Sequence, residues 1–99
     1  MEKTLRLIAQ DFNVDVEVVR TAVDRATAST NQLPFDVITR LQVATAGLLR
    51  ELGGRASLRA WSRQTIPALA DVRPLDILAQ GNVLALERVT KVLATGVFS

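Results

Sequence analysis

Residues 34–52 read PFDVITRLQVATAGLLREL, and this stretch decides the fold class. Its apolar side chains recur at steps of three and four residues, which places them on one face of an α-helix. Pro34 suits the first turn, where a missing N–H costs nothing, and Gly53-Gly54 stops the helix. The apolar stripe is so wide that we expect this helix to be central or paired. The stripe consists of Ile38, Leu41, Thr45, Leu48, Leu49 and Leu52, widened by Val37, Ala44 and Ala46.

The residues before this stretch predict two further helices. Residues 2–11 place apolar side chains on one face, and Asn13 tolerates the left-handed conformation that ends a helix. Asp15 is a suitable N-cap for a second helix over residues 16–28, which polar residues 29–32 interrupt.

The residues after it predict three more helices, separated by prolines and glycines. Pro67 and Pro74 bracket a loop, and Gly81 ends the short helix that Pro74 opens. Asn82 caps the last helix, and Gly96 is placed to end it. The expected spans are residues 56–62 or 56–63, residues 74–80 and residues 83–95.

No stretch favours a strand, so the predicted fold is all-α: a small bundle of about five to six helices with a helix-turn-helix-like N-terminal hairpin. The 99 residues give room for one compact domain. Residues 1–33 form the hairpin, which is either a helix-turn-helix remnant or a dimer arm. Residues 34–99 form the rest, and we expect both parts to pack as one unit.

The composition argues against several kinds of site. The chain has no cysteine and no histidine, which excludes disulfides and removes the commonest metal ligand and general base. No apolar run is long enough for a membrane span, and no secretory signal is evident. We therefore expect a cytoplasmic protein with no membrane contact, no metal and no cofactor.

Little in the sequence favours catalysis. Asp71 and Asp76 are a pair of carboxylates that could hold a metal or transfer protons. We expect Asp76 instead to stabilise the positive end of the dipole of the short helix that begins at Pro74. Asp71 is expected to face water. Gly53-Gly54 lacks the Lys-Ser/Thr of a phosphate loop. We expect the chain not to be an enzyme.

The net charge of +2 is unevenly distributed. Residues 1–49 carry five basic and six acidic side chains, whereas residues 50–99 carry seven basic and four acidic ones. This excess in the C-terminal half is either ordinary surface scatter or an electrostatic docking face.

Residues 8–23 resemble a helix-turn-helix, the element with which many repressors read DNA. The second helix of this pair nevertheless offers Glu17 and Asp24 beside Arg20 and Thr21, and the two carboxylates would repel phosphates. We interpret the segment as a hairpin or remnant, with DNA binding as a weaker alternative.

One string in the C-terminal half stands out by its order: Trp61, Ile66-Pro67-Ala68-Leu69, RPLDIL at residues 73–78, Gly81, and Glu87-Arg88-Val89. Residues 38–98, about three fifths of the chain, resemble through this string the toxin-binding domain of Xre/MbcA/ParS antitoxins. Ser62 departs from the family, which usually has leucine there, and Ala70 or Asp71 stands where glycine is common. We interpret seven residues as specifying the fold, with Trp61 filling the gap between the short helices and Leu75 turned inward: Trp61, Pro67, Leu69, Pro74, Leu75, Asp76 and Gly81.

The resemblance implies a protein partner, because antitoxins of this family bind RES-domain toxins that consume NAD or use it for ADP-ribosylation. NAD is anionic, so the carboxylate of Ser99 would compete for basic residues in the toxin's cleft. Phe98 is the expected apolar anchor, and Val97 either joins it or packs back on its own helix. Arg88 and Lys91 would add contacts at the rim, and Arg73 completes the predicted partner-binding set.

We therefore expect an antitoxin that neutralises a RES-domain toxin by covering its active-site cleft. The alternatives are a DNA-binding repressor that uses residues 8–23 and a structural adaptor that self-associates through residues 37–52. A homodimer is expected in the first two cases as well.

Overall fold

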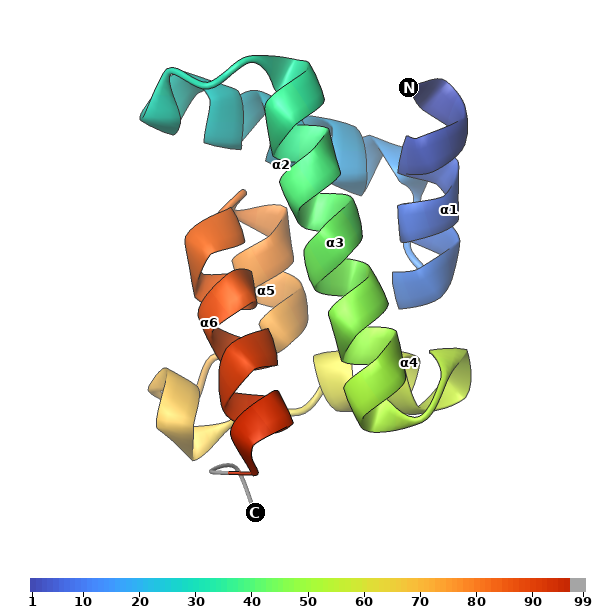
Figure 1. The fold of residues 1–99 in the computed structure, drawn as a ribbon, viewed down its shortest axis with the longest axis vertical. Helices are drawn as coiled ribbons and strands as arrows, with labels where there is room; N and C mark the ends of the chain where they lie inside the picture. The colour runs from blue at the N-terminus through green and yellow to red at the C-terminus, as the bar shows by residue number, and fades with distance from the viewer. Residues whose placement is uncertain (97–99) are drawn as a thin grey trace.

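Six α-helices and one short 3-10 helix follow one another in residues 1–96, the part of the chain that the computed structural model describes (Figure 1). No strand occurs in this part, where Ile66 and Val72 form an isolated bridge. The predicted all-α bundle is confirmed. The elements are α1 (Glu2–Phe12), α2 (Val16–Thr30), α3 (Pro34–Leu52), α4 (Arg55–Ser62), η1 (Pro67–Leu69), α5 (Pro74–Ala79) and α6 (Val83–Thr95).

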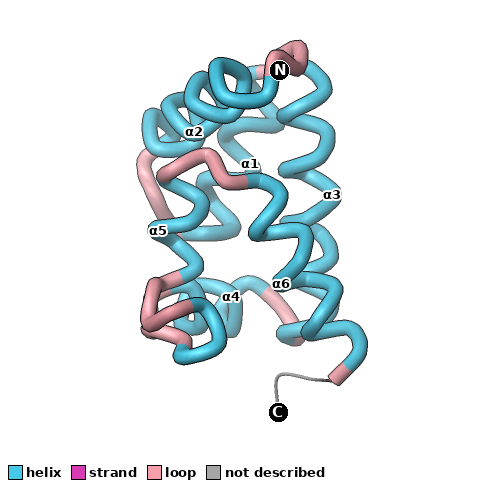
Figure 2. Tube along the Cα trace, turned by 90° about the vertical axis from the view of Figure 1, so that its left-hand side faces the viewer, coloured by secondary structure: helices cyan, strands magenta, loops and turns pink. Residues whose placement is uncertain are grey.

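Helix α3 is the centre of the bundle and packs against α1, α2, α4 and α6. Figure 1 shows α6 beside α3 and running in the same direction. Helix α2 crosses the upper end and α4 lies at the lower end, as the turned view in Figure 2 also shows. We call the start of α3 with α2 and the α5–α6 turn the upper end. The lower end comprises the end of α3, α4, residues 63–73 and the end of α6.

The apolar stripe of α3 is buried within the chain itself, so this helix is central. Leu49 and Leu52 are half-buried near its end. Ala46 is exposed, contrary to the prediction, because it lies about a third of a turn from the stripe's centre. The apolar side chains of this stripe, through which residues 37–52 would self-associate, are already buried in the core of the single chain. The buried residues of α3 are Val37, Ile38, Leu41, Ala44, Thr45, Gly47 and Leu48.

Gly47 allows α3 and α6 to approach closely, a role that the sequence analysis missed. A Cβ atom at this position would lie 2.6 Å from Cγ2 of Thr90 on α6. Glycine lowers helix stability in a helix interior, so its presence there was the signal for a close helix contact.

The α1–α2 hairpin forms as expected and shares one core with the rest. Asn13 adopts the left-handed conformation at φ 57°, and Asp15 accepts a hydrogen bond from the Glu17 N–H at 2.9 Å. Phe12 and Val19 are buried in the same apolar cluster as residues of α3, α4, α5 and α6. None of the helices in residues 1–96 has the length and apolar character of a membrane span.

Helix α2 is longer than predicted and ends at Thr30. The hydroxyls of Ser29 and Thr30 donate to the carbonyl of Ala26 at 3.3 and 2.6 Å, so these polar side chains fold back on the helix. Asn31, at φ 57°, then ends it.

Candidate protein-interaction surface

The lower end carries an apolar hollow, which we call the Trp61 groove. Its volume is about 370 Å³. The ends of α3 and α6 contribute Leu52 and Leu93, and α4 contributes Trp61. Residues 64–67 complete the lining with Gln64, Thr65, Ile66 and Pro67. Leu52, Trp61, Ile66 and Leu93 are each half-buried, so apolar surface remains accessible there.

Trp61 is half-buried and packs against the core cluster, while part of its surface stays open to this groove. Leu58 and Ser62 are the buried residues of α4, and Trp61 lies at the edge of the core with one side open. The hydroxyl of Ser62 donates to the carbonyl of Arg59 at 3.0 Å, which satisfies this polar group inside the core.

A tight turn shapes the loop before α5. Ala70 and Asp71 both adopt positive φ, at 59° and 62°. The N–H groups of Leu69 and Asp71 both donate to the carbonyl of Ile66, at 2.8 and 3.1 Å. Glycine adopts positive φ without steric cost, whereas the side chains of Ala70 and Asp71 make this conformation less favourable.

Arg73 and Asp76 hold each other at the start of α5. The Arg73 guanidinium donates to both carboxylate oxygens of Asp76, at 3.0 and 2.8 Å. These hydrogen bonds lower the pKa of Asp76 and raise that of Arg73. Asp71 is exposed and is absent from this pair. Within the described residues, no three acidic side chains are grouped as metal ligands.

Two arginines of α4, Arg55 and Arg59, together with Arg63 just after it, bind the end of α1. Arg55 forms an ion pair with Asp11 at 3.1 Å, and Arg59 donates to the carbonyl of Gln10. Arg63 donates to the carbonyls of Phe12 and Asn13, at 2.9 and 2.8 Å. The last carbonyls of a helix lack partners inside it and carry partial negative charge. Many of the basic side chains in the C-terminal half therefore bind groups of the chain itself.

Helix α6 keeps two exposed cations, Arg88 and Lys91. Neither has an ion-pair partner among residues 1–96, whereas Glu87, next to Arg88, is bound by Arg40 of α3. The predicted contacts Val97, Phe98 and Ser99 follow α6 and lie outside the described residues.

The prolines and glycine of the resembling string have different environments. Pro74 and Gly81 are buried, whereas Pro67 is exposed. A Cβ atom on Gly81 would lie 2.5 Å from the carbonyl oxygen of Ala22, so the α5–α6 turn rests directly on the α2 backbone. Leu69 and Leu75 are half-buried and pack against the core cluster.

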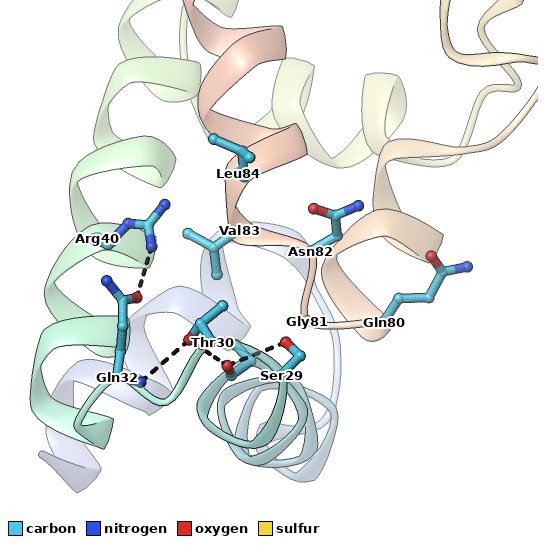
Figure 3. A pocket seen from close by; sticks show the side chains of 10 residues that line it. Ser29, Thr30, Gln32, Arg40, Gln80, Gly81, Asn82, Val83 and Leu84 are labelled. Carbon is cyan, nitrogen blue, oxygen red and sulfur yellow. Dashed lines mark hydrogen bonds between the residues drawn. The ribbon is translucent and has the colours of Figure 1, made fainter.

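A second hollow, which we call the upper hollow, lies between the end of α2, the start of α3 and the α5–α6 turn (Figure 3). Its volume is about 410 Å³. Several of its polar groups bind within the chain: Arg40 donates to Gln32 at 2.7 Å and also binds Glu87, and Thr30 donates to Ala26.

The outer face of α2 is acidic. Glu17 and Asp24 are exposed, as predicted from the spacing. Arg20 binds Glu2 at 2.8 Å and Glu17 at 3.0 Å, and its hydrogen bond lowers the pKa of Glu2. Arg25 donates to the carbonyl of Ala79 at 2.9 Å. Both arginines of the would-be recognition helix thus have partners inside the chain.

The Trp61 groove could not be found from local sequence patterns, because its lining comes from α3, α4, α6 and the loop between α4 and α5. Comparison of the chain with models of protein families, with curated proteins and with solved structures gives no match.

Proposed function

We propose that this chain is an antitoxin of the Xre/MbcA/ParS type. It binds a RES-domain toxin that consumes NAD or uses it for ADP-ribosylation, and it covers the toxin's active-site cleft. The observation that carries the proposal is the ordered string from Trp61 to Val89, with RPLDIL at residues 73–78 as its most distinctive part.

The environment of the string supports this proposal. Trp61, Ile66 and Pro67 line one accessible apolar groove, and the Arg73–Asp76 pair fixes the start of the following helix. Accessible apolar surface with polar residues at its edge is typical of protein-binding sites. The proposal therefore assigns toxin binding to the lower end of the bundle.

The proposed contact surface consists of α6 and the residues that follow it. Arg88 and Lys91 provide accessible positive charge, and Phe98 is the proposed apolar anchor. Arg73 offers no free positive charge to a partner, because its guanidinium binds Asp76. Its proposed role is to hold the start of α5 in place.

DNA binding receives less support from the surface chemistry. The exposed face of α2 carries Glu17 and Asp24, while Arg20 and Arg25 bind groups of the chain itself. Phosphate contacts supply most non-specific affinity for DNA and need accessible cations.

The test is an assay of NAD loss catalysed by the protein encoded beside this chain, which the proposal expects to be a RES-domain toxin. We expect NAD loss to stop when an equimolar amount of the chain is added. An active toxin that is unaffected by the chain would contradict the proposal.

A matched pair of charge reversals locates the surface. Arg88→Glu with Lys91→Glu should weaken inhibition roughly tenfold, which corresponds to about 1.4 kcal/mol. Lys3→Glu with Arg6→Glu makes the same charge change on exposed positions of α1 and should leave inhibition unchanged. Equal losses in both variants would show that overall charge, rather than the α6 face, governs binding.

Deletion of residues 96–99 provides a second test of the surface. We expect weaker inhibition with unchanged helical content by circular dichroism, because these residues follow the last helix. Full inhibition by the shortened chain would remove residues 97–99 from the proposed contact surface.

A further inference from the structure

Helix α3 has a face directed to solvent that is distinct from its buried stripe. The residues of this face recur at steps of three and four, and all of them are exposed. Val43 in the middle is 67% exposed, and Phe35 near the start is 64% exposed. Figure 1 shows α3 on the near side of the molecule, where no other helix lies in front of it. We call this face the outer face of α3; it consists of Phe35, Asp36, Thr39, Val43, Ala46 and Arg50.

The outer face carries opposite charges at its two ends. Asp36 and Arg50 each lie seven residues, about two helical turns, from Val43, so the three side chains form one row along the helix. Asp36 has no ion-pair partner among residues 1–96, and in that range Arg50 pairs only with its neighbour Glu51, at 3.8 Å. When such a row is turned end to end, its negative end meets the positive end of the original. The outer face is therefore complementary in charge to an antiparallel copy of itself.

The middle of the outer face is suited to close contact with another helix. Thr39, Val43 and Ala46 are short and uncharged, and their alternating steps of four and three residues are those of a helix that pairs along a seam. Short side chains allow two helix axes to approach to about 8 Å. The hydroxyl of Thr39 donates to the carbonyl of Phe35 at 3.0 Å, so burial of this seam would leave that donor satisfied.

A hollow between α1 and α3, which we call the α1–α3 hollow, borders the outer face and has room for an aromatic ring. Its volume is about 290 Å³, whereas a cavity of about 150 Å³ is enough to bind benzene. Leu7 of α1 and Ala46 and Leu49 of α3 contribute apolar side chains to its wall, and Leu7 is 45% exposed. The other lining residues are Thr4, Ile8, Gln42, Thr45 and the ion-paired Asp11 and Arg55.

Phe35 lies on the edge of α3 that borders this hollow, but at the other end of the helix. It precedes Gln42 by seven residues and Leu49 by fourteen, so the three side chains share one edge. Fourteen residues correspond to about 21 Å along the helix axis, and Phe35 is absent from the lining of the hollow in its own chain. The exposed ring and the hollow that could hold it are therefore separated in a single chain.

We propose that two copies of this chain pair through their outer faces, with the two α3 helices antiparallel around a two-fold axis near Val43. Asp36 of each copy then faces Arg50 of the other, and the short side chains meet in the middle. Each copy contributes the same residues, so the contact is isologous and closes at two copies.

The same axis brings Phe35 to the hollow of the second copy. A two-fold axis that crosses an antiparallel helix pair keeps the same edge of both helices on the same side. Phe35 of one copy therefore comes beside Leu49 of the second, and its ring enters the second copy's α1–α3 hollow. Two exposed rings are buried in this way, and exposed apolar surface of this kind is typical of protein-interaction sites.

This pairing leaves the proposed toxin contact free. Leu52, which α3 contributes to the Trp61 groove, follows Val43 by nine residues, or about two and a half turns, and so lies on the opposite side of the helix. Arg88 and Lys91 belong to α6 and are not part of the outer face. The inference concerns the chain alone, so its failure leaves the proposed function untouched.

Sedimentation velocity of the full chain, from micromolar to millimolar concentration, tests the pairing. We expect a reversible change from monomer to dimer. Val43→Glu places two carboxylates at the two-fold axis and should weaken association at least about tenfold. Ala28→Glu adds the same charge at an exposed position of α2 and should leave association unchanged.

Circular dichroism should show the same helical content for both variants and for the unaltered chain, because both positions are exposed on helices. A chain that remains monomeric at millimolar concentration would overturn the proposal. A dimer that Val43→Glu leaves as stable as before would overturn it as well, because the contact would then involve another surface.

An exchange of charges tests the antiparallel order. Asp36→Arg or Arg50→Asp alone places like charges opposite each other and should weaken association about three- to tenfold. The double variant restores opposite charges across the axis and should recover the association of the unaltered chain. In a parallel pair each position would face its own copy, so a double variant no better than the single variants would contradict the proposed order.

Nuclear Overhauser measurements on a mixture of isotope-labelled and unlabelled chains locate the ring. The proposal predicts cross-peaks between the Phe35 ring of one copy and the methyl groups of Leu7 and Leu49 of the other. These cross-peaks should weaken on dilution, as the dimer dissociates. A dimer in which the Phe35 ring shows no contact with the second copy would overturn the proposal.

Discussion

The two hollows of the bundle are nearly equal in size but differ in chemistry. The upper hollow has a volume of about 410 Å³ and the Trp61 groove about 370 Å³. In the upper hollow, Arg40, Gln32 and Thr30 all make hydrogen bonds within the chain. In the Trp61 groove, half-buried apolar side chains keep accessible surface. The volume of a hollow therefore does not identify an interaction site by itself. Apolar surface that stays accessible is the better indicator.

The largest predicted effect concerns how the upper end is assembled. Gly81→Ala should lower the free energy of unfolding by about 3 kcal/mol, because positive φ and contact with the α2 backbone both oppose a side chain. Gly96→Ala is the control, since Gly96 has nearly the same φ and open space around it, and should cost about 1 kcal/mol. Urea unfolding measures both. Equal costs would mean that the turn does not press against α2.

The second prediction concerns the contact between α3 and α6, the two helices that run from the upper end of the bundle to the lower end. Gly47→Ala should cost about 1–2 kcal/mol, because the added methyl group meets Cγ2 of Thr90. Thr90→Ser removes this methyl group and keeps the hydroxyl that donates to Leu86 at 2.8 Å. The double variant should therefore recover the loss. If Gly47→Ala alone stabilises the chain, helix propensity outweighs the close approach.

The third prediction sharpens the contrast at the lower end. Ala70→Gly should raise the free energy of unfolding by about 0.5–1 kcal/mol, because Ala70 adopts a φ of 59° that glycine tolerates better. Ala60→Gly on α4 is the control and should destabilise, since the same change occurs within a helix. Destabilisation by Ala70→Gly would show that the strain at this turn is negligible.

The smallest predicted effect is a pH dependence at the start of α5. Because Arg73 lowers the pKa of Asp76 in the folded chain, the pair stabilises the fold above the ordinary carboxyl pKa of about 4. This stabilisation is lost as the pH falls through the lowered value. The stability difference between the unaltered chain and Asp76→Asn should therefore shrink below about pH 4 in urea titrations. A difference that is constant with pH would contradict the role of the ionised pair.

Local signals in the sequence predicted the helix boundaries well, because a cap acts within a few residues. Pro34, Asp15 and Asn82 begin helices where expected, and Gly53 and Gly96 end them. The end of α2 was missed, because hydroxyls that can interrupt a helix bind back to it instead.

The candidate site was less predictable, because its parts are distant in the sequence. Arg63 donates to the carbonyl of Asn13, which is fifty residues away in the sequence. The sequence alone gives no sign that this guanidinium is bound within the chain. Trp61 was identified from the resembling string, but its half-buried position depends on Leu52 and Leu93, which come from other helices. Periodicity shows which face of a helix is apolar, but not how completely its neighbours cover that face.

The most direct test of the account is amide hydrogen exchange of this chain, alone and with the RES-domain toxin that we propose as its partner. We predict that the toxin slows exchange in residues 61–67 and 88–96 at the lower end and leaves residues 16–30 unchanged. Slower exchange confined to residues 16–30, or no change anywhere at saturating toxin, would contradict the claim that the lower end binds the partner.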